Sequence, residues 1–406
     1  MRSTLLLLLI LVLFACKNDP DPTPADIVTY SDVRSFTGNE NWIIAWNSKG
    51  ELLDYKKFAP DEVVTLKSTG DISDNKITIG FLNYSNSDDY KSHDISIFTD
   101  IAPGQTFAFA YPTSNNQNID DTKKFTVNVP STGIYRFLQI SDASGYSEGG
   151  GSGTEDFQLE CTIASAGEYN VMYRTDDNLR HKILSDVKAG DVINLTEDDF
   201  TPYEHQVTYT YPPGQVDLII NAYTPDIPIT SGGVVLDFYL GGKTSTSITT
   251  GYYGNSFNSF TTTFDHSSNS GHTFVQFTKL GSLPTEMKIP ESVSFPVTNK
   301  DPFNMAISSP SNALFHEMRW GNQLYQADGI KTSGYVQWTV IGPSDQVKIG
   351  ALPDEILAAY PLLKIDASHY MHSRVFLGPQ TYNEYVSMNL NNKRWDEYEQ
   401  TSVMSR

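Results

Sequence analysis

The chain has 406 residues and carries 28 lysines and arginines against 48 aspartates and glutamates, which gives a net charge of −20 at pH 7. A surface this acidic repels the phosphates of nucleic acids, so the composition argues against a nucleic-acid partner. The length exceeds what one hydrophobic core usually serves, and it predicts two or three domains.

The N-terminal segment combines Arg2 with an unbroken apolar run from Leu5 to Ala15. A transmembrane helix needs ~20 apolar residues, so this run is too short to span a bilayer. It fits the hydrophobic region of an export signal peptide, which we place at residues 1–15. The segment that ends the run, Leu13-Phe14-Ala15-Cys16, resembles the lipobox of bacterial lipoproteins.

The lipobox resemblance implies cleavage before Cys16 and attachment of a diacylglyceryl group to the Cys16 thiol. Two or more acyl chains hold a protein firmly on a membrane, so the expected location is the outer membrane, reached through lipidated Cys16. Residues 16–25 would form a proline-rich tether. Its start, Lys17 followed by acidic residues, is similar to the signal that sends Bacteroidetes lipoproteins to the cell surface. The alternative location is the periplasmic leaflet of the outer membrane. The alternatives are an ordinary signal peptide with a chance cysteine and a short membrane anchor.

The second cysteine of the chain, Cys161, has no partner for an internal disulfide if Cys16 is acylated. It alternates with Phe157, Leu159 and Ile163, which would share its face of a strand. This pattern predicts a buried structural thiol rather than a nucleophile.

The body of the chain alternates short β-rich runs with turn residues. Val234, Leu236 and Phe238 lie at every second position and would share one face of a strand. Such alternation recurs, and it predicts an all-β fold of tandem antiparallel β-sandwich-like domains. One short helix is predicted at residues 353–360, because prolines stand at its start and directly after its end.

Two segments of the chain, 42–66 and 169–195, are similar to each other. Each begins with two aromatic residues spaced four apart, Trp42/Trp46 and Tyr169/Tyr173, and closes with an alternating strand. The similarity predicts a duplicated domain with the aromatic pairs on equivalent strands, although any two hairpins of a β-rich chain can look alike. The predicted domains are 26–119, 120–228 and a C-terminal β-rich domain at 229–406.

Catalytic and cofactor motifs are scarce. The glycine run Ser147–Gly153 lacks the Lys-Ser/Thr pair of a phosphate-binding loop, so it is predicted to be a flexible surface loop. In a strand, His369 and His372 would point to opposite faces, which favours a structural role over metal binding. We therefore predict no catalytic residue, no metal site and no cofactor.

The most suggestive stretch for ligand binding is Gly251–Phe260, which mixes aromatic rings with amides and glycines. Flat rings stack on the C–H faces of sugars, and amides hydrogen-bond to sugar hydroxyls. We predict a surface loop that presents Tyr252 or Tyr253 to a ligand, with Asn255 and Asn258 fixing its orientation. The alternative is a hairpin whose aromatic residues fill a core.

These features predict a lipid-anchored cell-envelope protein with a non-catalytic role in binding or adhesion, toward a glycan or an envelope protein. The alternative is a hydrolase of surface polysaccharide with its site in 229–406. Two carboxylates facing each other in a deep cleft would favour the hydrolase, and a shallow strip of exposed rings would favour binding.

Overall fold

The computed structural model describes residues 23–405 with gaps. The gaps are 33–38, 71, 73, 88–89, 110–122, 143–146, 164–167, 177, 226–232, 241–244, 269–272, 291–292, 326–331 and 392–396. Cys16, the signal peptide 1–15 and most of the tether 16–25 lie outside the described residues, as do the residues at the two predicted domain boundaries. Strands make up 62% of the structure and helices 8%, which confirms the predicted all-β fold.

The first β-sandwich packs a three-stranded sheet on part of a larger sheet. The three-stranded sheet has the order β4-β1-β7, with β1 at Ala25–Asp32, β4 at Val63–Ser68 and β7 at Gln105–Phe109. The opposing strands have the order β3-β2-β5-β6, with β2 at Asn39–Asn47, β3 at Leu52–Phe58, β5 at Ile77–Ser87 and β6 at Tyr90–Ile101. Alternate residues of each strand face the other sheet, so Tyr30 and Leu66 are buried against Ile43, Ile79 and Phe98.

The second β-sandwich packs the sheet β11-β8-β14 on the sheet β10-β9-β12-β13-β15. Its strands are β8 at Lys124–Val129, β9 at Arg136–Asp142, β10 at Ser147–Gly153, β11 at Phe157–Thr162, β12 at Tyr169–Thr175, β13 at Leu179–Leu184, β14 at Val192–Asn194 and β15 at Thr201–Pro202. Cys161 lies in its core beside Phe125 and Leu138, which confirms the predicted burial of this thiol.

The two sandwiches repeat one topology, strand for strand. In each, the first strand pairs antiparallel with the fourth and parallel with the seventh, and the second strand lies between the third and the fifth. Thus β2 corresponds to β9, and β12 corresponds to β5. The predicted equivalence of Trp42/Trp46 on β2 with Tyr169/Tyr173 on β12 is therefore wrong. An aromatic pair at this spacing marks one face of any central strand and does not identify which strand it is.

The predicted flexible loop at Ser147–Gly153 is also wrong, because this segment is β10 and pairs antiparallel with β9. A Cβ atom at Gly150 would lie 2.3 Å from Oε1 of Gln139, and one at Gly151 would lie 2.8 Å from the Phe157 ring. The glycines leave room for side chains of neighbouring strands. A glycine-rich composition, which is typical of flexible loops, therefore allows close packing of strands here.

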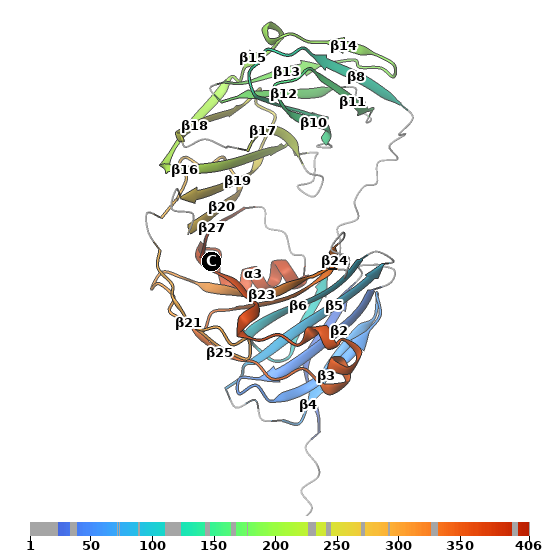
Figure 1. The fold of residues 1–406 in the computed structure, drawn as a ribbon, viewed down its shortest axis with the longest axis vertical. Helices are drawn as coiled ribbons and strands as arrows, with labels where there is room; N and C mark the ends of the chain where they lie inside the picture. The colour runs from blue at the N-terminus through green and yellow to red at the C-terminus, as the bar shows by residue number, and fades with distance from the viewer. Residues whose placement is uncertain are drawn as a thin grey trace, which may run out of the picture.

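A central sheet of 13 strands within the described residues connects the sandwiches, in the order β17-β16-β19-β20-β27-β26-β23-β24-β6-β5-β2-β3, with β18 beside β16. Its further strands are β16 at His205–Tyr223, β17 at Val234–Leu240, β18 at Ser245–Tyr252, β19 at Ser259–Ser268, β20 at Thr273–Gly281, β23 at Phe315–Tyr325, β24 at Thr332–Gly342, β26 at Tyr370–Pro379 and β27 at Tyr398–Ser405. Figure 1 shows the sandwiches at opposite ends of the molecule, with β19, β20 and β27 between them.

The pairing of β6 with β24 is parallel and joins the predicted domains 26–119 and 229–406 in one sheet. The domain boundaries themselves stay a prediction. At its other end, the central sheet packs on the second sandwich, where Phe137 and Met172 contact a cluster that includes Leu218 and Phe264.

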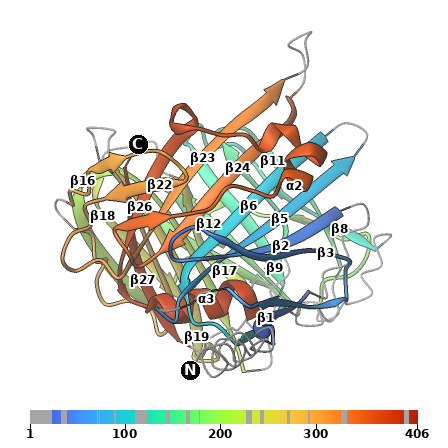
Figure 2. The same ribbon diagram turned by 90° about the horizontal axis from the view of Figure 1, so that it is seen from below.

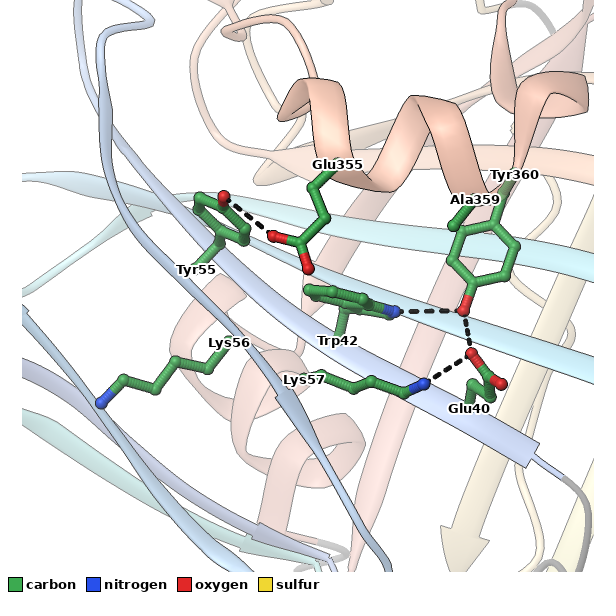
Figure 3. A pocket seen from close by; sticks show the side chains of 8 residues that line it. All are labelled: Glu40, Trp42, Tyr55, Lys56, Lys57, Glu355, Ala359 and Tyr360. Carbon is green, nitrogen blue, oxygen red and sulfur yellow. Dashed lines mark hydrogen bonds and ion pairs between the residues drawn. The ribbon is translucent and has the colours of Figure 1, made fainter.

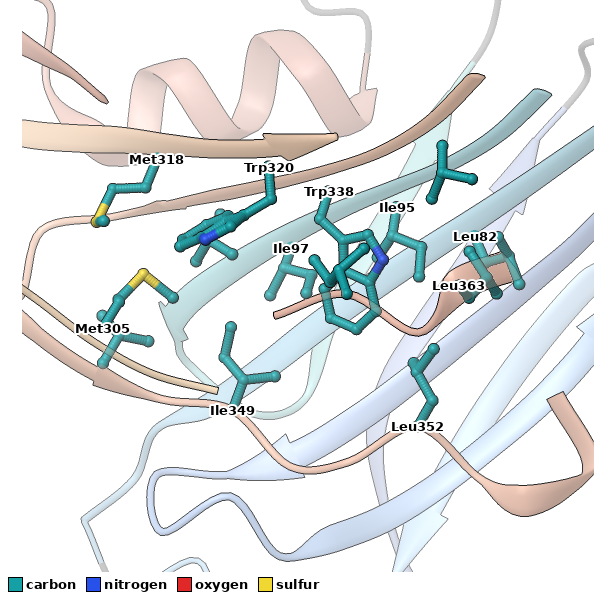
Figure 4. Close-up of a cluster of buried hydrophobic side chains, with 14 of the residues drawn as sticks. Leu82, Ile95, Ile97, Met305, Met318, Trp320, Trp338, Ile349, Leu352 and Leu363 are labelled. Carbon is teal, nitrogen blue, oxygen red and sulfur yellow. The ribbon is translucent and has the colours of Figure 1, made fainter. Parts of the chain in front are cut away.

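The two faces of the central sheet near β6 are covered differently, as the view from below shows (Figure 2). One face carries α2 at Asp354–Ala359, the 3-10 turn Pro361–Leu363 and a small sheet of β21 at Val297–Asn299, β22 at Asn304–Ile307 and β25 at Gln346–Lys348. Beneath them Trp320 and Trp338 pack with Ile95 and Ile97 (Figure 4). The other face carries α3, at Tyr382–Asn391, and the sheet of β1.

The helix predicted at 353–360 is present as α2, but the longer helix α3 was not predicted. Its buried residues Tyr382, Val386 and Leu390 recur every fourth position. Thr381 and Glu384 cap its start, since the Thr381 N–H donates to Glu384 Oε2 and the Glu384 N–H donates to Thr381 Oγ1. The spacing of Thr381 and Glu384 is a capping-box pattern, which could have predicted the start of α3 from the sequence. Within the described residues, no helix is long and apolar enough to cross a membrane.

His316, on β23, is a buried histidine that should make stability depend on pH. Its side chain is 1% exposed, and among the described residues neither ring nitrogen has a hydrogen-bond partner. Burial lowers the pKa of His316 from 6.5 to about 4, against the opposing influence of Asp345 and Asp100. Between these two pH values the unfolded chain binds a proton that the folded chain does not, which costs ~3 kcal/mol of stability as the pH falls through the window.

We expect the wild type to lose more stability than His316→Leu when urea unfolding is compared at about pH 7 and about pH 4. Both proteins contain the same other titrating groups, so the difference between their losses isolates His316. Equal losses would contradict the expectation.

Candidate functional site

A pocket of about 500 Å³ lies where the hairpin of β2 and β3 meets α2 (Figure 3). It is lined by Glu40, Trp42, Tyr55, Lys56, Lys57, Glu355, Ala359 and Tyr360. We call this the hairpin pocket.

Strand alternation brings the hairpin residues of this pocket together. Trp42 and Lys57 are directly opposite each other in the β2–β3 pairing. Glu40 and Tyr55 each lie two residues before one of them, and therefore on the same face. Lys56 points away from the others in Figure 3, and its ammonium donates to the Thr65 carbonyl.

Two aromatic rings form the apolar part of the hairpin pocket. The rings of Trp42 and Tyr55 are stacked, with centroids 6.2 Å apart and an interplanar angle of 28°. Trp42 is only 6% exposed, whereas Tyr55 is half-buried. The Lys57 ammonium lies 5.9 Å from the centroid of the Trp42 ring. Tyr55 is therefore the ring that a ligand can reach, and Trp42 supports it from behind.

A hydrogen-bonded chain fixes one carboxylate of the hairpin pocket. Lys57 Nζ lies 2.8 Å from Glu40 Oε2, and the Tyr360 hydroxyl donates to the same oxygen. Trp42 Nε1 in turn donates to the Tyr360 oxygen over 3.3 Å. The bonds from Lys57 and Tyr360 lower the pKa of Glu40, while burial and the Glu40 bond raise the pKa of Tyr360 to about 12. At neutral pH Glu40 is a fixed acceptor and Tyr360 keeps its proton.

The second carboxylate comes from Glu355 in the first turn of α2. It is exposed, and it accepts a hydrogen bond of 3.2 Å from the Tyr55 hydroxyl. Burial and this bond raise the pKa of Tyr55. The hydroxyl thus stays protonated and holds the Glu355 side chain beside the rings.

The paired carboxylates are better suited to hydrogen bonding than to acid catalysis. A glycosidase acid needs a carboxyl group whose pKa is raised by an apolar environment. The shift at Glu40 has the opposite sign, and Glu355 is exposed to solvent.

The predicted ligand residues lie elsewhere, at the connection from β18 to β19. The Tyr252 ring stacks on His205, with centroids 4.5 Å apart, and the Tyr253 ring stacks on His181 at 4.9 Å. Both tyrosines are half-buried and pack at the edge of the core between the central sheet and the second sandwich. Each thus has a ring face covered by a histidine.

The two predicted amides of this connection are exposed. Asn255 Oδ1 lies 3.2 Å from His205 Nε2, and the Asn258 backbone N–H donates to the Tyr223 carbonyl. The structure places Asn255 near the Tyr252–His205 pair. It brings none of the four predicted residues to the hairpin pocket, and ligand binding by them stays a prediction.

The paired histidines of the H-x-x-H motif have different carboxylate partners. His369 Nδ1 lies 3.0 Å from Asp366, whereas His372 Nε2 lies 3.9 Å from the buried Glu317. In the part of the chain that the structure describes, no group of three or more histidine, cysteine or acidic residues could hold a metal ion.

Sequence reasoning missed the hairpin pocket because its two halves are far apart in the chain. Tyr55 and Glu355 are separated by 300 residues, and no spacing pattern connects them. A local signal was available within the hairpin of β2 and β3, where every second residue lies on the same face: Glu40 and Trp42 on β2, Tyr55 and Lys57 on β3.

Comparison with known proteins yields little. No family model and no curated protein matches the chain. A solved structure described as a biofilm associated protein, BSP domain, is 10% identical over 64% of this chain and 67% of that one, with a TM-score of 0.13. E. coli alpha-2-macroglobulin is 9% identical over 89% of this chain but only 26% of its own length, with a TM-score of 0.12. Likenesses this low carry no argument about fold or function.

Proposed function

We propose that this protein is a non-catalytic glycan-binding module of the cell envelope, and that the hairpin pocket holds the glycan. The observation that carries the proposal is the combination of an accessible ring, Tyr55, with two carboxylates that are already fixed by hydrogen bonds.

A sugar ring could lie with its C–H face on Tyr55, because aromatic faces favour such contacts over contacts with hydroxyls. Its hydroxyls would then meet Glu355 on one side and the Glu40–Lys57 pair on the other. Because both carboxylates are held before a ligand arrives, binding costs little further side-chain ordering. Ligand sites generally combine an apolar surface with a few polar groups at fixed positions.

The proposal includes a lipid anchor at Cys16 and a place at the outer membrane. Its support is the lipobox resemblance of Leu13-Phe14-Ala15-Cys16. An acidic surface such as this chain carries favours solubility beside a membrane.

The test is Tyr55→Ala, measured with the full chain on a glycan array and then by calorimetry with the best soluble oligosaccharide. We expect the dissociation constant to rise roughly 5- to 150-fold, as for the loss of a contact worth ~1–3 kcal/mol. Tyr135→Ala is the matched control, since Tyr135 is 48% exposed and lies outside the pocket.

Unchanged affinity of Tyr55→Ala would overturn the site, and no binding to any glycan would overturn the ligand class. Release of reducing ends from the bound glycan by the wild type, abolished by Glu355→Gln, would instead establish the hydrolase alternative.

A further inference from the structure

A second pocket, of about 310 Å³, lies beside α3 on the opposite face of the strands that carry Trp42. Its lining residues are Tyr30, Phe81, Asn83, Ser92, Asp94, Ser96, Phe98, Tyr335, Asn389 and Leu390. Asn83 and Asp94 are each next in the chain to Leu82 and Ile95, which face the cluster of Trp42. Because successive residues of a strand point to opposite faces, the two pockets are separated by the sheet.

Neighbouring strands bring the polar side chains of this pocket side by side. Asp94 on β6 is directly opposite Asn83 on β5, which in turn is opposite Asn41 on β2. On the other side of β6, Tyr335 on β24 is paired with Ser92. Four adjacent strands thus present a row of amide, carboxyl and hydroxyl groups on one face.

Hydrogen bonds hold this row in place. The Tyr335 hydroxyl donates to Asp94 Oδ2 over 3.0 Å, and Asn83 Nδ2 donates to Asn41 Oδ1 over 2.9 Å. Burial raises the pKa of Asp94, and the bond from Tyr335 opposes that shift. Ser92 and Ser96 add hydroxyl groups that can donate or accept.

The other end of the pocket is aromatic. The rings of Tyr30 and Phe81 lie 4.6 Å apart, and Phe98 contacts Phe81 edge-on at 6.3 Å. Among the described residues that line the pocket, none is basic. The donors and acceptors suit a neutral ligand with several hydroxyl groups. The volume lies at the lower end of the range for ligand pockets, ~300–1,000 Å³, which suits a small ligand.

We infer that this pocket is a second binding site, which takes a neutral sugar ring by hydrogen bonds to Asn83, Asp94 and the two serines, with its apolar face toward Phe81. The inference goes beyond the hairpin pocket, because the sheet separates the sites and neither shares a lining residue with the other. One protein molecule would then bind two sugar units at once.

The test measures binding of neutral methyl glycosides to the full chain by saturation-transfer NMR, in the Tyr55→Ala background that weakens the hairpin pocket. Two changes address the second pocket. Ser96→Leu fills it, and Asp94→Asn keeps its shape while replacing the carboxyl acceptor. Asp61→Asn is the control, since Asp61 lies outside both pockets in a turn with a positive φ of 63°, which asparagine tolerates.

We expect residual binding in the Tyr55→Ala background, its loss with Ser96→Leu, and a weakening of about tenfold with Asp94→Asn, as for a lost hydrogen bond to a carboxyl group. Asp61→Asn should change nothing. No residual binding, or binding that both changes leave intact in a folded protein, would overturn this site. Either result leaves the hairpin pocket to be judged by Tyr55→Ala against the wild type alone.

Discussion

Replacing Asp237 with alanine is expected to lower the free energy of unfolding by ~3–5 kcal/mol, because it leaves a buried guanidinium without its carboxylate. Asp237 on β17 is fully buried, and its Oδ2 lies 3.2 Å from Nη1 of Arg174 on β12, which is 3% exposed. Nη1 of Arg174 also donates to the Thr249 carbonyl, and the guanidinium lies over the Tyr239 ring. The pair therefore joins the second sandwich to the edge of the central sheet.

Burial raises the pKa of Asp237, so desolvation outweighs the attraction of Arg174. A buried pair of this kind is costly to break but contributes little in itself. The double variant Arg174→Met with Asp237→Leu should consequently recover most of the stability that either single change loses.

Urea unfolding of the full chain measures these effects, with Glu160→Ala as the matched control. Glu160 pairs with Lys124 at 2.8 Å, but both side chains are largely exposed. An exposed pair contributes ~0–1 kcal/mol, so this control should unfold almost as the wild type does. If Asp237→Ala behaved like Glu160→Ala, the buried pair would not hold the two parts together.

Trp46→Ala is expected to cost ~3–5 kcal/mol, the range for truncating a large buried aromatic residue. Trp46 is fully buried, and its indole N–H donates to the Ala351 carbonyl over 3.2 Å. Two glycines make room for the ring: a Cβ at Gly80 would lie 2.9 Å from Cζ3 of Trp46, and one at Gly350 would lie 2.3 Å from Cδ1. The Trp46 ring thus holds the segment between β25 and α2 against the central sheet.

The same contacts predict that Gly350→Ala overpacks the site and destabilises the protein by ~1–3 kcal/mol. In a Trp46→Ala background this cost should shrink, although the Gly50 carbonyl, 2.3 Å from the added Cβ, limits the relief. A double-mutant cycle by urea unfolding measures the coupling. Val63→Ala is the control, because Val63 is 66% exposed on β4. Additive effects of the Trp46 and Gly350 changes would contradict this packing.

The two candidate ligand sites show which contacts a local sequence pattern cannot predict. The sequence predicts that Tyr252 or Tyr253 is presented to a ligand, and in the structure one face of each ring is stacked on a histidine, His205 or His181, from another strand. A local pattern cannot predict these contacts, because the sequence around an aromatic residue is the same whether another side chain or solvent covers its ring. The hairpin pocket needs Glu355 from a helix 300 residues away.

The local features of this protein could be predicted from its amino-acid sequence. Alternation of apolar and polar residues indicates which side of a strand is buried. It was therefore sufficient to predict the all-β fold and the burial of Cys161. The positions of two prolines were sufficient to predict α2. These features depend on neighbours within a few residues.

The pairing of the strands, in contrast, depends on the complete fold. The parallel contact of β6 with β24, the true correspondence of β2 with β9, and the glycine run that forms β10 all depend on segments distant in the chain. Every residue type except proline offers the same backbone donor and acceptor, so alternation leaves the partner of a strand undetermined. The partner is selected by the fit of side chains across the completed core, as Trp46 fits between Gly80 and Gly350.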